Sequence, residues 1–580
     1  MSSTKALTLV YNEIKEVNGR LTEVERERAE LKEKLKVLTA KASELESRRE
    51  NGDEQNLWND TNYGWDGEVN KCLNKVFGLS TFRPLQRAAI NLALSKEDSL
   101  IIMSTGAGKS LCYQLPAMVH NSGITLVVSP LISLMNDQLM HLQMLGINAM
   151  SFNANSTKEE ASNILKWICD KNSTLRLLYV TPEKLAKSKR FINKLEKCYE
   201  FDLLKLIAID EVHCCSQWGH DFRRDYKFLG ILKRQFPKTP LMGLTATATL
   251  DVITDVKKIL DIRSCVTLKT AFNRKNLHYE VLQKPESTEE TNLLISNLLT
   301  TEFAGQTGII YCLSRKDCEE LTKDLKARGV RCTYYHGDVE AEGRNRAHEK
   351  WNSGEYQVII ATLAFGMGID KPDVRFVIHH SIAKSMENYY QESGRAGRDD
   401  KPAKCIALFK LADIFKQSTM NYTDAVSHLY GMMKYCIQTY ECRRMAMSEY
   451  FGETYDKSWC DRKCDFCCRS STNVSEVDIT EQTRLVMEIL QDKQVGKDRI
   501  TGNKLLELLY KKLDDSREGL EKVVGTLLLE GYLKEEFHFT PYSVISYIVR
   551  GSRSVQGRVT MLSDLTVMEG KSSAKRRRNK

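Results

Sequence analysis

The strongest constraint on the fold is an alternation of short apolar runs with longer helical stretches, repeated in two series along the chain. Continuous apolar runs of this length predict strands that are buried on both faces. The runs are Ser99–Met103, Ile124–Ser129, Leu177–Thr181, Leu206–Asp210 and Pro240–Thr245 in residues 70–275, and Gly308–Tyr311, Val358–Thr362 and Phe376–His379 in residues 276–415. This alternation favours two tandem α/β domains, each a parallel sheet covered by helices, with ligands at the carboxyl ends of the strands.

The length and composition exclude several classes of protein. A chain of 580 residues with 42% hydrophobic and 28% charged residues is typical of a globular protein of several domains. It has no apolar run of the roughly 20 residues that a membrane span needs and no apolar block of a secretory signal, so we expect no membrane partner and an intracellular location. The 17 cysteines are therefore expected to be reduced.

A glycine-rich turn follows the first apolar run of the first series. It reads Met103-Ser104-Thr105-Gly106-Ala107-Gly108-Lys109-Ser110. Backbone N–H groups in such a turn cradle phosphates, a lysine reaches the β- and γ-phosphates, and a serine hydroxyl binds magnesium. The turn predicts an ATP site formed by Thr105, Gly106, Gly108, Lys109 and Ser110, with Lys109 also counted as catalytic.

An acidic pair stands at the end of the run Leu206–Asp210. Asp210 is expected to bind magnesium together with Ser110, and Glu211 to position and deprotonate the attacking water. The alternative is a solvated acidic pair at a strand end. In the second domain, Arg395 and Arg398 lie three residues apart, so both guanidinium groups could face the cleft and stabilise the transferring phosphoryl group. Of the two, Arg398 is expected nearer the γ-phosphate.

Further segments resemble the ordered motifs of superfamily 2 helicases, and specifically of the RecQ family, over about residues 75–550. The segments are Phe82–Gln86, Val128–Met135, Gly243–Thr249, Ala361–Asp370 and Gln391–Arg398. The resemblance implies that the two domains are RecA-like and that Arg83 and Gln86 recognise adenine. It also implies ATP-driven 3′ to 5′ movement on single-stranded DNA and unwinding of forked or branched duplex.

The resemblance also implies where DNA is contacted. Ser216–Arg223 is similar to the aromatic-rich loop of the family, so Trp218, Phe222 and Arg223 are predicted to contact DNA, the aromatic rings by stacking on bases. Residues 476–560 resemble a winged-helix domain in which Ser516–Leu529 would face the DNA groove. Tyr542 matches the tip of the hairpin that separates strands in short members of the family, and the chain resembles such a member.

Cysteines in residues 416–475 have the spacing of a metal site. Reduced thiols at short spacing with one distant partner suit a closed tetrahedral zinc site, and the same positions match the family's zinc subdomain. The predicted zinc ligands are Cys442, Cys460, Cys464 and Cys467.

The two ends of the chain carry patterns of their own. Residues 1–50 contain an apolar seven-residue repeat that predicts a helix, either for self-association into a homo-oligomer or for packing on its own chain. Residues 561–580 form a basic tail that predicts a nuclear-import address or a nucleic-acid tether rather than mere solvation. We therefore expect a nuclear protein.

The sequence thus predicts an ATP- and Mg²⁺-dependent, zinc-containing 3′ to 5′ DNA helicase acting in repair, recombination or replication. Two alternatives remain. An RNA-remodelling DExH protein would share the motor motifs but would not need the zinc and winged-helix modules. A DNA strand-annealing scaffold that uses ATP as a switch would also fit the terminal segments.

Overall fold

The computed structural model describes residues 34, 58–120, 122–216, 223–366, 371–420, 426–469, 474–495 and 498–564. The predicted heptad helix, apart from Lys34, lies outside the described residues. So do Trp218 and Phe222 of the predicted DNA loop and the basic tail from residue 565 onward.

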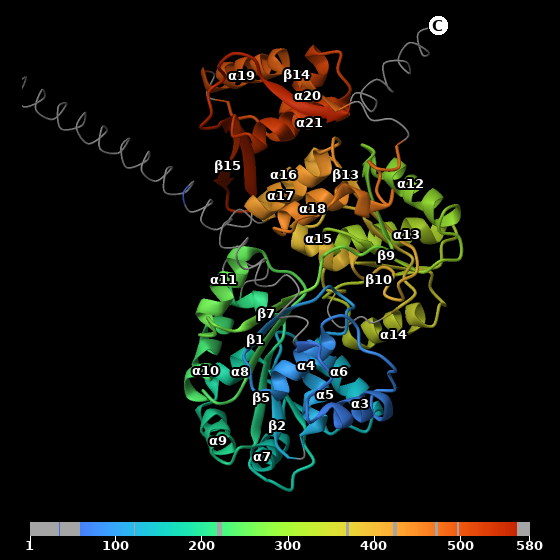
Figure 1. The fold of residues 1–580 in the computed structure, drawn as a ribbon. Helices are drawn as coiled ribbons and strands as arrows, with labels where there is room; N and C mark the ends of the chain where they lie inside the picture. The colour runs from blue at the N-terminus through green and yellow to red at the C-terminus, as the bar shows by residue number, and fades with distance from the viewer. Residues whose placement is uncertain are drawn as a thin grey trace, which may run out of the picture.

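Lobe 1 is built on a seven-stranded parallel sheet with the order β3-β4-β2-β5-β6-β1-β7. Its strands are β1 Ser99–Ile102, β2 Ile124–Val128, β3 Ala149–Phe152, β4 Leu177–Val180, β5 Leu204–Ile209, β6 Leu241–Thr245 and β7 Val266–Lys269. Its helices are α3 Asp66–Lys75, α4 Gln86–Leu94, α5 Leu111–Val119, α6 Ile132–Met144, α7 Lys158–Trp167, α8 Pro182–Lys187, α9 Lys189–Glu200, η1 Val212–Cys215, η2 Arg224–Leu229, α10 Gly230–Gln235 and α11 Leu250–Ile259. Figure 1 shows α4 and α5 on one side of the sheet and α9 and α10 on the other.

Lobe 2 is built on a six-stranded parallel sheet with the order β10-β11-β9-β12-β13-β8. Its strands are β8 Leu277–Gln283, β9 Gly308–Tyr311, β10 Cys332–Tyr335, β11 Val358–Ala361, β12 Phe376–His379 and β13 Ala403–Phe409. Its helices are α12 Thr288–Thr300, α13 Arg315–Ala327, α14 Ala341–Asn352 and α15 Met386–Ser393.

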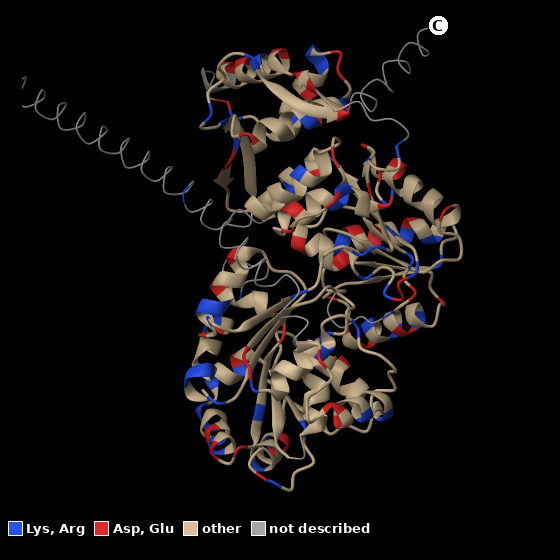
Figure 2. Cartoon of the chain, viewed as in Figure 1, with Lys and Arg blue, Asp and Glu red and all other residues tan. Residues whose placement is uncertain are grey.

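Both sheets are covered because successive side chains of a strand point to opposite faces. In β1, Leu100 and Ile102 belong to one buried cluster, whereas Ile101, with Met103 directly after the strand, belongs to another. The central strands β1, β2, β9, β11 and β12 contain no charged residue, and β1, for example, is tan in Figure 2. The predicted pair of α/β domains is therefore confirmed.

Two smaller modules follow lobe 2. The zinc module contains α16 Leu411–Met420, α17 Val426–Ile437, α18 Arg443–Tyr450 and η3 Lys457–Cys460. The C-terminal module contains β14 Val474–Asp478, α19 Thr480–Val495, α20 Gly502–Lys512, α21 Arg517–Leu529, β15 Leu533–Phe539, β16 Val544–Arg550 and β17 Thr560–Asp564. The predicted domain boundary at residues 415 and 416 falls inside α16, because that helix continues directly from β13.

The expectation that Ser516–Leu529 faces a DNA groove is wrong for this structure. No residue of α21 is exposed, and Val524 is fully buried. The helix packs against α17 and α20, and Gly525 lies so close to Ile437 that an added Cβ would sit 3.3 Å from it. The Glu521 carboxylate accepts a hydrogen bond from the backbone N–H of Leu411 at 3.0 Å, so α21 holds the C-terminal module on α16.

Candidate functional site

The glycine-rich turn lies between β1 and α5, at the carboxyl edge of the first sheet. Gly106 and Gly108 have φ values of 82° and 78°, in the left-handed region that favours glycine. The Lys109 ammonium donates to the backbone carbonyl of Met103 at 3.3 Å. The Thr105 hydroxyl is buried and has no hydrogen-bond partner among the described residues. The turn therefore keeps the backbone shape and the unused polar groups that suit a phosphate chain.

Arg83 and Gln86, the predicted adenine-binding residues, lie against the same turn. The guanidinium of Arg83 donates to the carbonyl of Gly106, and the amide of Gln86 donates to the carbonyl of Gly108 at 3.0 Å. A Cβ at Gly108 would lie 2.5 Å from the Gln86 amide nitrogen, so a side chain at this position would displace the Gln86 amide from the turn. Both residues are thus adjacent to the phosphate turn.

The acidic pair directly follows β5. Asp210 is buried, and its carboxylate accepts a hydrogen bond from the N–H of Glu211 at 3.0 Å. Burial, and then the neighbouring Glu211 charge, raise the pKa of Asp210 to about 7, while the Lys109 ammonium opposes them. A carboxylate whose charge is so disfavoured is one that a nearby cation stabilises, and the donor set therefore fits a divalent metal ion.

A chain of polar contacts leads from the acidic pair toward lobe 2. His213 Nδ1 lies 2.9 Å from the Thr245 hydroxyl and 3.4 Å from a Glu211 carboxylate oxygen. The Thr245 hydroxyl in turn accepts from the N–H of Thr247 at 3.2 Å. Gln391 on α15 donates to the Thr247 hydroxyl at 3.5 Å, so the chain crosses from one lobe to the other.

The two predicted catalytic arginines occupy different places. Arg398 lies on the phosphate turn, because a Cβ at Gly106 would be 3.1 Å from its Cγ. Arg395 is 7% exposed, beside Gly366 and Tyr311 of its own lobe. We expected that both could face the cleft, and Arg398 is the one placed against the turn.

Arg274, in the segment between the lobes, is a site residue that sequence reasoning missed. Its guanidinium donates to the carbonyl of Thr105 in lobe 1 at 3.1 Å. It also donates to the carbonyls of Ala396 and Gly397, at 3.3 and 2.7 Å, in the loop that carries Arg398. Arg274 therefore ties the arginine loop to the phosphate turn. A single arginine in a linker gives no sequence signal for this role.

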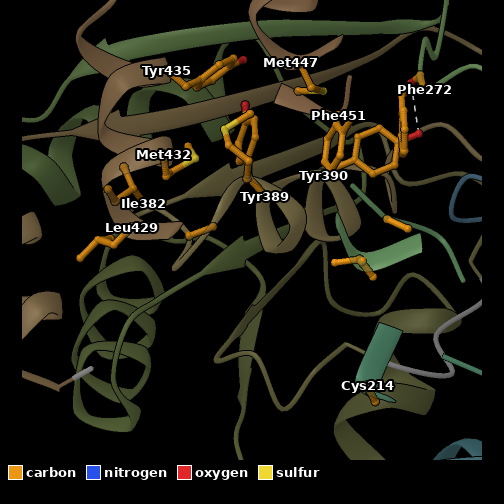
Figure 3. Close-up of a cluster of buried hydrophobic side chains, with 14 of the residues drawn as sticks. Cys214, Phe272, Ile382, Tyr389, Tyr390, Leu429, Met432, Tyr435, Met447 and Phe451 are labelled. Carbon is orange, nitrogen blue, oxygen red and sulfur yellow. Dashed lines mark hydrogen bonds between the residues drawn. The ribbon is translucent and has the colours of Figure 1, made fainter. Parts of the chain in front are cut away.

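An aromatic cluster that includes Tyr390 holds α15 in place (Figure 3). Phe272 stacks on Phe451 with ring centroids 4.3 Å apart, and the Tyr390 ring meets Phe272 edge-on at 5.1 Å. The Tyr390 hydroxyl donates to the carbonyl of Phe272 at 3.1 Å. The linker, α15 and the zinc module thus share one core.

The four predicted zinc ligands come together in the zinc module. The sulfur atoms of Cys442, Cys460, Cys464 and Cys467 all lie within 4.8 Å of one another. Such a thiol cluster fits a tetrahedral zinc ion. Cys468 is exposed, and neither it nor Cys436 belongs to the set.

The cysteine cluster is joined directly to the second sheet and to the linker. The Asp465 N–H donates to the carbonyl of Tyr279 in β8 at 3.0 Å, and the Asp465 carboxylate accepts from the N–H of Val281 at 3.2 Å. Arg444, two residues after Cys442, donates to the carbonyl of Arg274 at 2.8 Å. The zinc module therefore supports the segment that carries Arg274.

Of the residues predicted to contact DNA, the structure describes Arg223 and Tyr542. Arg223 donates to the carbonyl of Pro130 at 2.8 Å, in the segment Val128–Met135. Tyr542 stands in the turn of the β15–β16 hairpin and is 97% exposed. Arg223 thus belongs to lobe 1 and Tyr542 to the C-terminal module.

Three family descriptions match consecutive parts of the chain. They are DEAD/DEAH box helicase at residues 83–256, helicase conserved C-terminal domain at 290–400, and RecQ zinc-binding at 408–468. The chain is 46% identical over 578 residues to the ATP-dependent DNA helicase Q1 of Mus musculus, covering 96% of this chain and 89% of the relative. The chain belongs to the RecQ family of ATP-dependent DNA helicases.

Other RecQ relatives agree. A Caenorhabditis elegans protein named as an ATP-dependent DNA helicase Q1 is 55% identical over 510 residues, with 86% of this chain and 80% of the relative covered. Among solved structures, the DUF1998 helicase MrfA bound to DNA and AMPPNP matches with a TM-score of 0.50 at 16% identity, over 70% of this chain and 60% of that one. This last likeness supports the fold alone.

Among the described residues, no helix combines the length and apolar character needed to cross a membrane.

Proposed function

We propose that this RecQ helicase requires Mg²⁺, moves 3′ to 5′ on single-stranded DNA and opens forked or branched duplex. The observation that carries the proposal is the placement of Arg398 from lobe 2 on Gly106 of lobe 1. An arginine held across a cleft from the phosphate turn is sensitive to the γ-phosphate, so hydrolysis changes how the two lobes are held together. Repeated closing and opening of that cleft is what drives movement along a strand.

The roles in hydrolysis follow from the positions of the side chains. Lys109 binds the β- and γ-phosphates, and Ser110 and Asp210 would hold magnesium, which supplies neutralisation of phosphate charge when bound. Glu211 orients the attacking water and accepts its proton. Arg398 stabilises the charge that spreads over the transferring phosphoryl group, an effect of about 10³–10⁵ in rate.

The C-terminal module is proposed to be a winged-helix domain, because α19, α20 and α21 precede the hairpin β15–β16. Its exposed tip residue Tyr542 would separate the strands at a fork, while Trp218, Phe222 and Arg223 would couple single-stranded DNA to the acidic pair. A DNA base-pair step holds about 1.4 kcal/mol and a stacked aromatic ring about 1–3 kcal/mol. The hairpin can thus hold open a step or two, and progress comes from ATP.

The terminal segments carry two further proposals, and the cellular process is a third. The heptad repeat in residues 1–50 would form a homo-oligomer, and the basic tail in residues 561–580 would direct the chain to the nucleus. There we propose that it acts in repair, recombination or replication, the processes that produce forked and branched DNA.

Strand separation on a set of forks tests the proposal. We expect ATP- and Mg²⁺-dependent unwinding of a fork that keeps only its 3′ arm, and none of a fork that keeps only its 5′ arm. Lys109→Ala should hydrolyse no ATP while still binding the fork, because the lysine contacts nucleotide and not DNA.

Equal unwinding of both one-armed forks would contradict the polarity, and normal turnover by Lys109→Ala would contradict the phosphate site. The same assay addresses the alternatives. Preference for duplex RNA would favour an RNA-remodelling role. Annealing of complementary strands without ATP would show that a scaffold activity accompanies or replaces unwinding.

A further inference from the structure

The strand-separating hairpin is stiff at its tip and attached at its base. At the tip, the Thr540 N–H donates to the carbonyl of Ser543 at 2.9 Å, and the Ser543 N–H donates back to the Thr540 hydroxyl at the same distance. Strands β15 and β16 pair along their full length from Leu533 to Phe539. Figure 1 shows β15 extending from the C-terminal module past α16 and α17. The orientation of Tyr542 is therefore set by whatever holds the base.

Glu535 holds that base through three hydroxyl groups from different elements. The Ser418 hydroxyl of α16 donates to its carboxylate at 2.6 Å, and the Tyr430 hydroxyl of α17 donates at 2.9 Å. The Ser546 hydroxyl of β16 donates to the same carboxylate. Ser418 is fully buried and Ser546 is 6% exposed. The carboxylate thus joins both strands of the hairpin to two helices of the zinc module.

The partners of Glu535 are neutral donors. Burial raises its pKa, against the hydrogen bonds from the three hydroxyls, which lower it. An ionised carboxylate accepts stronger hydrogen bonds than a neutral group, so these hydroxyls are its compensation for lost solvation. Without these hydroxyls, the Glu535 carboxylate would be more stable in water, with the hairpin turned away from α16. The three hydrogen bonds therefore favour the one position of the hairpin in which Glu535 lies against α16.

Helix α16 carries the attachment on into lobe 2. The Lys284 ammonium forms an ion pair with Asp413 of α16 at 2.8 Å and donates to the Ser381 hydroxyl at 3.2 Å. Gln417, next to Ser418, donates to the carbonyl of Ile382 at 2.8 Å. Ser381, Ile382 and Gln417 line a cavity of about 590 Å³ at the carboxyl edge of the second sheet. One short helix therefore connects the base of the hairpin to the floor of this cavity.

We propose that Glu535 is a positioning residue that fixes the hairpin on lobe 2, so that the wedge moves with this lobe during each ATP cycle. The proposal rests on the proposed role of the hairpin in strand separation. The hydrogen-bond partners of the Glu535 carboxylate lie on α16, α17 and β16, away from the phosphate turn. It acts by keeping Tyr542 at a constant place relative to the lobe that travels.

The experiment compares amide exchange in residues 533–550 with the number of base pairs opened per ATP, in the full chain. Glu535→Ala should raise hydrogen exchange in this segment by about tenfold or more, because the hairpin loses its side-chain hydrogen bonds to α16 and α17. Unwinding should fall by about tenfold or more, while single-stranded DNA stimulates ATP hydrolysis to within about twofold of the unaltered rate. Tyr430→Phe removes a single donor without changing the ring and should produce a smaller loss of the same kind.

The neighbouring residue Glu536 offers a matched control. It is exposed on the other face of β15, so Glu536→Ala removes the same charge and should change neither exchange nor unwinding. If Glu535→Ala does not fold, Glu535→Gln keeps the size of the side chain and one acceptor oxygen, and should show the same change in weaker form.

Unchanged exchange in residues 533–550 would overturn the proposal, and so would faster exchange with normal unwinding. Tyr542→Ala distinguishes failure of the positioning role of Glu535 from failure of the proposed strand-separating role of the hairpin. If that variant unwinds normally, the hairpin is not the wedge, whatever Glu535 does. If Tyr542→Ala fails to unwind and Glu535→Ala unwinds normally, the wedge stands and the positioning role of Glu535 falls.

Discussion

Single side chains at the cleft hold together loops that are far apart in the sequence. Arg274 contacts Thr105, 169 residues away, and Gly397, 123 residues away. Its planar guanidinium can donate several hydrogen bonds in one plane, which a lysine cannot. Because its acceptors are backbone carbonyls, the contact constrains the path of both loops and leaves the catalytic side chains free to act.

Arg274→Ala should lower the kcat for ATP by about a hundredfold, because a shift of about 1 Å in Arg398 would weaken its proposed stabilisation of the transferring phosphoryl group. The KM for ATP should change less, since the phosphate turn itself is intact. Arg274→Lys should restore only part of the rate. Lys275→Ala, an exposed neighbour, is the control for charge. Steady-state ATP hydrolysis with single-stranded DNA measures both constants. An unaltered kcat in Arg274→Ala would contradict a role for this residue in hydrolysis.

Whole elements are held by polar groups at their ends as well as by their apolar faces. Directly after β12, His380 is partly buried, and its pKa is lowered from 6.5 to about 3 by burial and by Lys284, Lys410 and Lys416, against the opposing charge of Asp317. The unfolded chain therefore binds a proton here between these two pH values, whereas the folded chain does not. Stability is lost as the pH falls below about 6.5.

At pH 5 the titration of His380 lowers the free energy of unfolding by about 2 kcal/mol, at about 1.4 kcal/mol per pKa unit. His380→Gln should therefore lose less thermal stability between pH 7 and pH 5 than the unaltered chain. His141→Gln, at an exposed position, should keep the full dependence. Thermal unfolding across this pH range measures the difference, and parallel curves for all three proteins would show that His380 does not titrate on unfolding.

Across the whole molecule, the zinc module is the joint between the parts. It shares an aromatic core with α15, bonds to β8 through Asp465 and supports the linker through Arg444. A structural zinc site contributes about 10–16 kcal/mol, which is comparable to the whole stability of a domain. Loss of zinc should thus disturb the ATP site as well as the module.

Metal analysis of the purified chain should find about one zinc ion per molecule, as four thiolate ligands predict. Cys460→Ser should lose the metal, become sensitive to proteolysis within residues 411–469 and hydrolyse ATP more slowly. Cys468→Ser should keep all three properties, because Cys468 lies outside the cluster. Zinc-free protein with normal ATP hydrolysis would mean that the module does not support the linker.

The sequence predicted the elements and residues whose signal is local. The inner strands other than β13 came from apolar runs, whereas β13, whose sequence Ala403–Phe409 includes Lys404, was not predicted. The cysteine set and the phosphate turn came from spacing. The edge strands β3, β7, β8 and β10 were not recognised, because they are only partly buried and lack a continuous apolar run. The roles of Glu535 and Arg274 had no local signal.

The short sequence motifs of this chain determined the chemistry that each loop can perform, because phosphate, metal and thiol sites depend on residues close together in sequence. The tertiary structure decided which of these groups meet. It placed Arg398 rather than Arg395 on the phosphate turn, buried α21 instead of exposing it, and tied the hairpin to α16 through Glu535. Such contacts depend on how separate elements pack, and packing is a property of the whole fold rather than of any one segment.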